Sequence, residues 1–174
     1  DLEKQIQKVI VEGKLVPKAI ISVDLFGLPA NYPELERIAK KYNLKLIEDA
    51  AQGFGGAIID AEGNQRKAGS FGDIATTSFF PAKPLGCYGD GGAVFTNNDE
   101  YASLLKSYRV HGKGADKYDN VRIGLNSRLD TIQAAILLEK LAEFPDELVK
   151  RNKVAETYTR LLGDSFTTPV VPSG

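Results

Sequence analysis

The sequence has very little cysteine and histidine, and it contains no methionine or tryptophan. Its one cysteine, Cys87, cannot form a disulfide within the chain, and with His111 as the only histidine there is no ligand cluster for zinc. No apolar run approaches membrane-spanning length, and the first residues do not form a signal peptide. We therefore expect a cytoplasmic protein that holds no metal ion and does not interact with a membrane.

The chain also lacks an excess of charge of either sign. It carries 22 Lys and Arg against 23 Asp and Glu, a net charge of −1, and the two signs are interspersed. No basic stripe suggests a nucleic acid partner, so chemistry on small molecules is the expected class of function. The 174 residues, 43% of them hydrophobic, suit a soluble α/β domain. Because the chain starts within a predicted helix and lacks methionine, we expect it to be part of a longer protein.

A strand, a helix and a second strand follow one another early in the chain. The apolar, β-branched run at 19–23 predicts a strand that is buried on both faces. Asn31 can cap the next helix, with Glu34 completing a capping box, and the apolar face continues to Tyr42. Residues 44–47 predict another buried strand. This pattern favours a right-handed βαβ unit in a parallel sheet, where ligands bind at the carboxyl ends of the strands.

The other elements follow from periodicity, capping and turn residues. They are a helix over the first dozen residues that ends at Gly13, a loose hairpin and loop over 56–73, strands at 74–80 and 91–96, a helix at 99–108, a long polar loop from Arg109 to Tyr118, a helix from Ile132 that is broken at Pro145, and a last helix over about 147–162. Long loops in compact domains are usually functional or mobile. His111, in that loop, could carry a proton or could be structural.

Two residues at the expected sheet edge have the chemistry of a reactive site. Lys83 lies in a turn between Pro81 and Pro84, which restrict the backbone on either side of it. It is either a solvated turn lysine or a reactive amine that a rigid backbone presents. Asp49 follows the second strand and is either a cap or turn residue or a carboxylate that faces a cationic ligand.

Six short strings resemble the DegT/DnrJ/EryC1/StrS sugar aminotransferases, which depend on pyridoxal phosphate, and they occur in the order and at the spacing of that family. They are Glu48–Gln52, Gly69–Asp73, Ser78–Lys83, Gly89–Ala93, His111–Gly112 and Gly124–Arg128. The resemblance implies part of the three-layer α/β large domain of a fold type I, aspartate aminotransferase-like enzyme, with a mainly parallel sheet flanked by helices. Residues 1–145 would belong to this domain, and 146–174 would form a linking helix and the start of a small carboxy-terminal domain. The upstream loop for the cofactor phosphate would be missing.

The same resemblance implies roles for five residues. Lys83 would hold the aldehyde of pyridoxal phosphate as an imine and later move protons, and Asp49 would pair with the pyridine nitrogen. Gln52 would lie beside the ring. Ser78 would bind the cofactor phosphate, and Asn126 would reach the phosphate from the other subunit of a homodimer.

The implied reaction moves an amino group from L-glutamate to a UDP-linked keto-sugar during the synthesis of lipopolysaccharide or other glycans. The resemblance leaves open 3-keto uronic acids and 4-keto-6-deoxy amino sugars. A pyridoxal-dependent sugar dehydratase is an alternative, but those relatives carry histidine where this chain has Lys83. A non-catalytic regulatory or binding protein is the other alternative. A nicotinamide-binding domain is disfavoured because no G-x-G-x-x-G follows the first strand.

Overall fold

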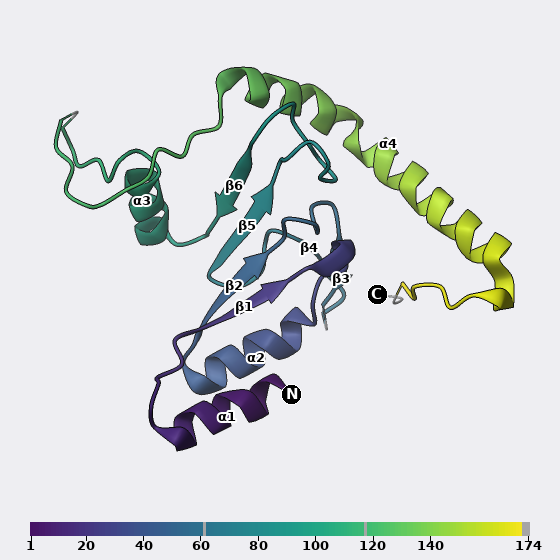
Figure 1. Ribbon diagram of the computed structural model, residues 1–174, viewed down its shortest axis with the longest axis horizontal. Coiled ribbons are helices and arrows are strands. Elements are labelled where there is room, and N and C mark those ends of the chain that lie inside the picture. The colour runs from purple at the N-terminus through teal and green to yellow at the C-terminus, as the bar shows by residue number, and fades with distance from the viewer. Residues whose placement is uncertain (61, 117, 172–174) are drawn as a thin grey trace.

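The computed structural model describes residues 1–60, 62–116 and 118–171. Its centre is a four-stranded sheet in the order β1 (Ala19–Val23), β2 (Lys45–Asp49), β5 (Ile74–Ser78) and β6 (Gly92–Phe95). The first three strands are parallel, and β6 runs antiparallel to β5 (Figure 1). The predicted mainly parallel sheet and its βαβ unit are therefore confirmed.

Two amphipathic helices pack beside β1 and β2. Helix α1 (Leu2–Glu12) ends at Gly13, whose φ of 65° suits glycine, and α2 (Tyr32–Tyr42) begins at Asn31, whose side chain accepts the N–H of Glu34. The apolar residues between the helices and the strands form what we call the first cluster. It comprises Ile6, Ile20, Tyr32, Ile38, Ala39, Leu44, Leu46 and Phe71.

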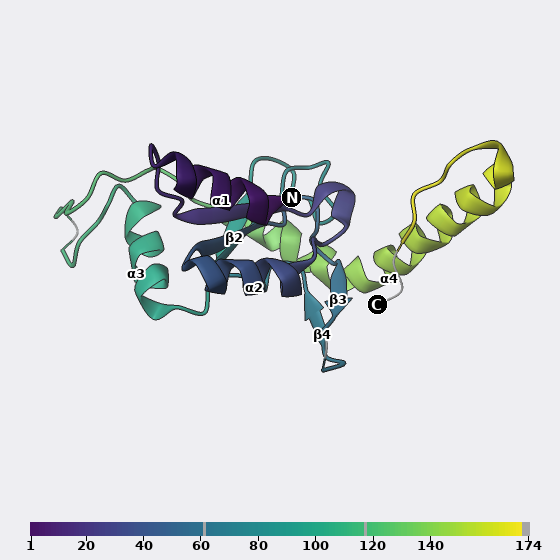
Figure 2. The same ribbon diagram turned by 90° about the horizontal axis from the view of Figure 1, so that it is seen from below.

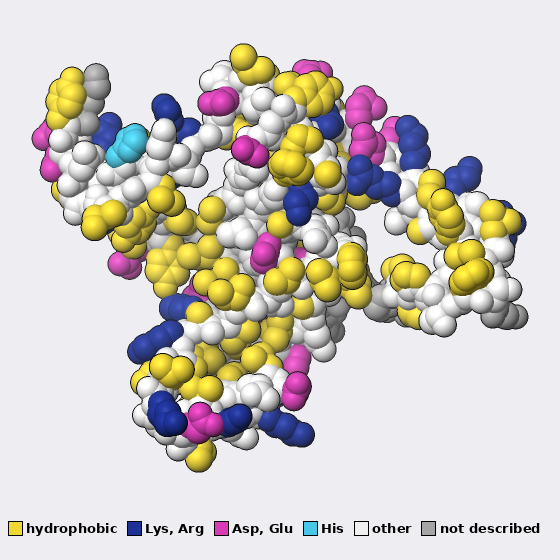
Figure 3. Space-filling view, viewed as in Figure 1, with side chains coloured by type: hydrophobic (Ala, Val, Ile, Leu, Met, Phe, Trp, Pro, Cys, Tyr) yellow, Lys and Arg dark blue, Asp and Glu magenta, His cyan; other side chains and the backbone are white. Residues whose placement is uncertain are grey.

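The prediction that the first strand is buried on both faces is wrong for this chain. Burial alternates along β1, so that Ile20 is in the core while Ile21 is 68% and Val23 47% exposed. The reason is that α1 and α2 cover one face only, and no described element covers the other. Figure 3 shows exposed hydrophobic side chains across the middle of the molecule, and others along its long helix.

Three smaller elements and a long connection complete the sheet region. Strands β3 (Ala57–Ile59) and β4 (Gln65–Lys67) form the expected hairpin, and the short helix η1 (Leu25–Gly27) follows β1. Helix α3 (Asp99–Tyr108) begins at its cap Asn98. The connection from α3 to α4 includes a bridge between Val110 and Asn126. Lys117, in the predicted long loop, lies outside the described residues.

The last helix, α4 (Thr131–Leu162), is continuous through Pro145 and leads into the short helix η2 (Gly163–Ser165). The predicted break at Pro145 is therefore wrong. A proline inside a helix costs roughly 3 kcal/mol, but burying a side chain such as Phe144 offsets a cost of this size. Phe144 is 5% exposed, and Leu137 and Leu148 pack in the same cluster from either side of the proline.

These contacts belong to the second cluster, which joins α4 to the Lys83 loop. Its buried members are Phe79, Leu85, Cys87, Leu137 and Phe144. Beyond it, α4 extends away from the sheet (Figures 1 and 2). The domain boundary expected after residue 145 falls within α4, and residues 172–174 of the expected second domain lie outside the described residues. None of the described helices is both long enough and apolar enough to cross a bilayer.

Candidate functional site

The carboxyl ends of β2 and β5 meet at one edge of the sheet, and backbone bonds join them. The N–H of Ala50 donates to the carbonyl of Thr76 at 2.8 Å, and the Thr77 hydroxyl donates to the carbonyl of Ala50 at 3.1 Å. Asp49 is the last residue of β2, and Ser78 is the last residue of β5. The structure therefore brings these two predicted site residues to the same edge.

Asp49 and Gln52 are fixed by short-range contacts after β2. One oxygen of Asp49, Oδ1, accepts the N–H of Ala51 at 3.0 Å. Gln52 lies in the following turn, and its Oε1 accepts the N–H of Phe26 at 2.7 Å. Both side chains are half-buried. Their polar groups are thus oriented by the backbone before any ligand is present.

Lys83 lies in the turn that follows β5, where the chain folds back tightly. Its backbone N–H donates to the carbonyl of Phe80 at 2.8 Å, and the N–H of Cys87 donates to the carbonyl of Phe79 at 2.8 Å. A Cβ atom on Gly86 would lie 2.6 Å from the carbonyl oxygen of Pro81, so only glycine fits there. These bonds and the close approach at Gly86 define the path of the backbone that carries Lys83.

Helix α4 supports this loop with three polar side chains. The Lys140 ammonium donates to the carbonyl of Gly86, and Arg151 donates to the carbonyl of Pro84 at 3.1 Å. Gln133 Oε1 accepts the N–H of Tyr88 at 2.8 Å. Sequence reasoning missed all three residues because each contact joins positions far apart in the chain. The one signal in the sequence is that all three lie on the same side of the predicted helices as the apolar residues Leu137 and Phe144, which would have placed them near the core.

Four predicted site residues share one property, which is that each keeps a functional atom free. Among the described residues, none forms a hydrogen bond or ion pair with the Lys83 ammonium, Asp49 Oδ2 or the Gln52 amide nitrogen. Ser78 Oγ accepts the N–H of Phe80 at 3.2 Å, which leaves its own proton available to an acceptor. In Asp49 and Gln52 one polar atom anchors the side chain and the other is available to a ligand, whereas in Ser78 the hydroxyl oxygen is the anchor and its proton is available.

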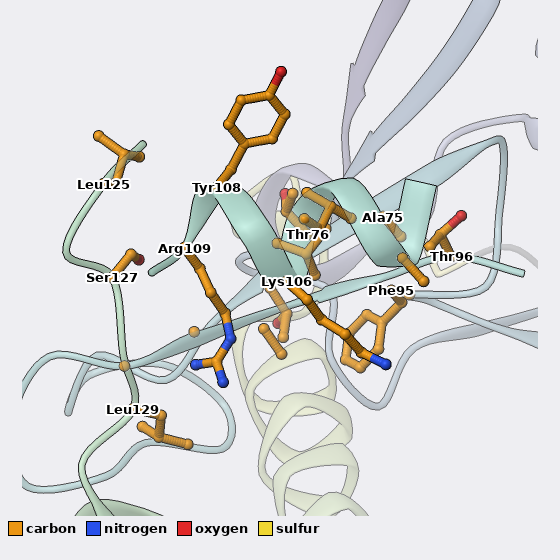
Figure 4. A pocket seen from close by; sticks show the side chains of 18 of the residues that line it. Ala75, Thr76, Phe95, Thr96, Lys106, Tyr108, Arg109, Leu125, Ser127 and Leu129 are labelled. Atoms are coloured by element: carbon orange, nitrogen blue, oxygen red, sulfur yellow. The ribbon is translucent and has the colours of Figure 1, made fainter. Parts of the chain in front are cut away.

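Asn126, the fifth predicted residue, lies elsewhere. It is exposed, and its Oδ1 accepts from Arg128 at 3.1 Å. It lines a cavity of about 1120 Å³ between α3, the sheet and the segment 125–129. Figure 4 shows Lys106, from α3, and Arg109, the residue that follows this helix, extending into this space. The cavity lining includes none of the other four predicted residues, so this cavity is not where the free lysine lies.

His111 is exposed and has a positive φ of 58°, and its N–H donates to the carbonyl of Leu125 at 2.8 Å. In this chain the residue contributes to the backbone of the connection after α3. Among the described residues, no group of three or more His, Cys, Asp and Glu could hold a metal ion.

Comparison with known proteins identifies the family. The model of the DegT/DnrJ/EryC1/StrS aminotransferase family matches residues 2–172. The chain belongs to this family. It is 48% identical over 151 residues to the UDP-2-acetamido-2-deoxy-3-oxo-D-glucuronate aminotransferase of Pseudomonas aeruginosa, covering 86% of the chain and 40% of that protein. It is 47% identical to the pleiotropic regulatory protein of Geobacillus stearothermophilus, covering 87% and 40%.

Two solved structures share the fold of this chain. A family aminotransferase from Brucella abortus superposes with a TM-score of 0.93 at 54% identity, covering 99% of this chain and 45% of that one. NtdA of Bacillus subtilis, solved with its cofactor PMP bound, gives a TM-score of 0.74 at 35% identity, covering 87% and 34%. The partial large domain that the sequence predicted is therefore confirmed. The chain spans less than half the length of these relatives.

Proposed function

We propose that this chain contributes the lysine-bearing part of a pyridoxal-phosphate site in a nucleotide-sugar aminotransferase. The observation that carries the proposal is the set of free atoms at one sheet edge, an amine, a carboxylate oxygen, an amide N–H₂ and a hydroxyl. Membership of an aminotransferase family supports it. Pyridoxal phosphate presents an aldehyde, a basic ring nitrogen, a phenolic oxygen and a phosphate, so the donor set fits this cofactor.

The roles follow from the chemistry of the free atoms. When bound, the cofactor supplies a conjugated ring that accepts the electrons left behind when a proton leaves the carbon that carries the amino group. The amine of Lys83 would bind the aldehyde and carry that proton. Asp49 Oδ2 would hold a proton on the ring nitrogen, because an adjacent carboxylate favours the charged ring. The Ser78 hydroxyl would bind phosphate, and the Gln52 amide would contact the ring.

The amino acceptor we propose is a UDP-linked keto-sugar, and the amino donor is L-glutamate. The Pseudomonas relative supports this choice, since its name describes the amination of a UDP-linked 3-oxo uronic acid. The enzyme would then act in the cytoplasm, in the synthesis of lipopolysaccharide or another glycan.

We also propose that the active protein is a homodimer in which Asn126 acts across the interface. Two features support this. Asn126 is exposed and separate from the other four residues, and the uncovered sheet face and α4 carry exposed hydrophobic side chains such as Ile21 and Leu138.

A regulatory role is the second candidate, because the Geobacillus relative is named a regulatory protein. The free Lys83 favours catalysis, since a binding protein has no need of an unpaired amine on a rigid turn. Lysine at this position also disfavours the dehydratase, whose family members carry histidine there.

The deciding experiment incubates the full-length protein with L-glutamate and a panel of UDP-keto-sugars while 2-oxoglutarate is measured. We expect 2-oxoglutarate to form with one of the sugars and only when both substrates are present. The Lys83→Ala variant is the control and should form none. Formation of 2-oxoglutarate by that variant at the wild-type rate would contradict the proposed site. If the wild type forms no 2-oxoglutarate with any sugar, the regulatory role is favoured.

A further inference from the structure

Two acidic side chains, Asp24 and Glu48, lie on the same buried side of the sheet. In the parallel register of β1 and β2, Ser22 is paired with Glu48, and Val23 is paired with Asp49. Because side chains alternate along a strand, Asp24 points to the same face as Ser22 and Glu48. The N–H of Asp24 continues the ladder by donating to the carbonyl of Asp49 at 3.0 Å. Asp24 and Glu48 are each 0% exposed.

Three of the four oxygens of these two carboxyl groups have hydrogen-bond partners. The Glu48 oxygens accept the N–H of Gly69 at 2.6 Å and of Phe71 at 2.8 Å. Asp24 Oδ1 accepts from the hydroxyl of Tyr32 at 2.6 Å and from the N–H of Ala30 at 3.2 Å.

The second oxygen of Asp24, Oδ2, is the exception. Among the described residues it is the one buried side-chain oxygen or nitrogen without a hydrogen-bond partner. It lies so close to Gly53 that a Cβ atom there would be 2.7 Å away, so the pocket has no room for an added side chain. A buried acceptor left unpaired is costly, and so are two buried negative charges side by side.

We propose that Asp24 and Glu48 share one proton in a hydrogen bond between Asp24 Oδ2 and the Glu48 carboxyl group, and that this bond positions the strand end carrying Asp49. The shared proton pairs the orphaned oxygen and removes one of the two buried charges. Asp24 and Glu48 flank Asp49 through the ladder and the chain, so the pair fixes the backbone of Asp49 from both sides. The positioning role rests on the proposed function of Asp49, whereas the shared proton does not.

The surroundings of the pair agree with this assignment. Burial, and to a smaller extent the neighbouring Asp24, raise the pKa of Glu48 from its ordinary 4.5 to about 7, although the N–H groups of Gly69 and Phe71 act to lower it. From α2, the Tyr32 hydroxyl donates to Asp24. From β4, Arg66 is the nearby cation, but its guanidinium makes two hydrogen bonds to Glu36 and stacks on the Phe71 ring at 4.6 Å. No described cation therefore neutralises the pair by direct contact.

The pair makes stability depend on pH in a defined direction. The folded protein holds a proton on the pair up to about pH 7, whereas the unfolded chain releases it above the ordinary Glu48 pKa of 4.5. The contribution of this proton to the free energy of unfolding is therefore complete below about pH 4.5 and is lost as pH rises through about 7. The folded state should then remain less stable at higher pH.

The matched variant is Asp24→Asn, measured in the cofactor-free, full-length protein. Its amide Oδ1 can accept from Tyr32 and Ala30, and its N–H₂ can donate to ionised Glu48 without any titration. We expect the thermal midpoint of the wild type to fall by several degrees between pH 5 and pH 8, and that of Asp24→Asn to change much less. Asp24→Ala should be less stable than both at each pH. Parallel pH curves for wild type and Asp24→Asn would overturn the proposal.

Infrared spectroscopy tests the proton without any variant. In wild-type protein labelled with ¹³C-glutamate or ¹³C-aspartate, the carbonyl stretch of a protonated carboxylic acid should be present at pH 6 in one of the labelled samples and disappear above pH 8. Its absence from both samples at pH 6 would also overturn the proposal. Both measurements remain informative if the protein proves to have no transaminase activity, because neither uses the cofactor or a substrate.

Discussion

The two clusters support opposite halves of the candidate site, and they are built differently. The first cluster comes from successive elements between Ile6 and Phe71 and lies beneath the strand end that carries Asp49. The second joins the loop around Leu85 to α4, far along the chain, and supports Lys83. The first cluster borders the buried acids Asp24 and Glu48, whereas the second is apolar apart from Cys87.

The two clusters also differ in the kind of contact that positions each half of the site. Asp49 is placed by the hydrogen-bond ladder of a parallel sheet, so its position follows from local strand pairing. Lys83 is placed by side chains of a distant helix that contact the carbonyls of its loop. The two halves of the site should therefore respond separately to substitutions in the two clusters.

The largest effect is expected at Lys83 itself. In the full-length protein, Lys83→Ala should lose the visible absorbance of the cofactor imine and its trapping by borohydride, and activity should fall by about 10³-fold or more. Lys150→Ala, which changes an exposed lysine of α4, is the control and should retain both. A borohydride-stable adduct on another peptide of the Lys83→Ala protein would show that a different lysine is reactive.

The next largest effect is expected at Asp49. Asp49→Asn keeps an oxygen that can accept the N–H of Ala51, so the fold should be retained. The amide cannot stabilise a protonated ring nitrogen by charge, and we expect turnover to fall by about 10²–10³-fold. Steady-state kinetics at matched cofactor saturation measures this change. Near-wild-type turnover would show that Asp49 has no role in catalysis and is a turn residue.

Truncations in the two cores compare the clusters directly. Phe144 and Ile38 are each 5% exposed, and Phe144→Ala should cost about 3–5 kcal/mol and Ile38→Ala about 2–5 kcal/mol in the free energy of unfolding. Only Phe144→Ala should increase proteolytic cleavage in the Lys83 loop. Equal cleavage in both variants, at matched fractions of unfolded protein, would mean that the clusters are not independent supports.

The smallest effect is expected at Arg151. Its side chain is 50% exposed and makes one bond to the carbonyl of Pro84 and an ion pair with Glu147, so Arg151→Ala should cost about 1 kcal/mol or less. Denaturant titration against Arg160→Ala, a change of another exposed α4 arginine, provides the comparison. A cost several-fold larger would make Arg151 a principal support of the loop.

The sequence predicted features that depend on neighbouring residues. The cap at Asn31, the end of α1 at Gly13 and the turn around Lys83 all follow from local backbone chemistry, and the structure confirms each. Membership of the family was also predicted, because its six strings keep their order and spacing.

The features that sequence reasoning missed depend on tertiary contacts. The helix continues through Pro145 because Phe144 is buried beside it, and no local pattern encodes that burial. The pairing of Asp24 with Glu48 requires the register of two strands, and the roles of Lys140 and Arg151 require α4 to lie against the loop. The role of Asn126 stays a prediction, since it requires a second subunit whose presence nothing in this chain tests.

The long separation between the Lys83 loop and α4 has a consequence for synthesis on the ribosome. Gly86 and Lys140 are 54 positions apart, and Pro84 and Arg151 are 67 apart. At about 5–20 residues per second, the strands of the βαβ unit emerge several seconds before all of α4 is available. We therefore expect the nascent chain to form the aspartate side of the site first, because the supports of its lysine loop are available only after α4 has emerged.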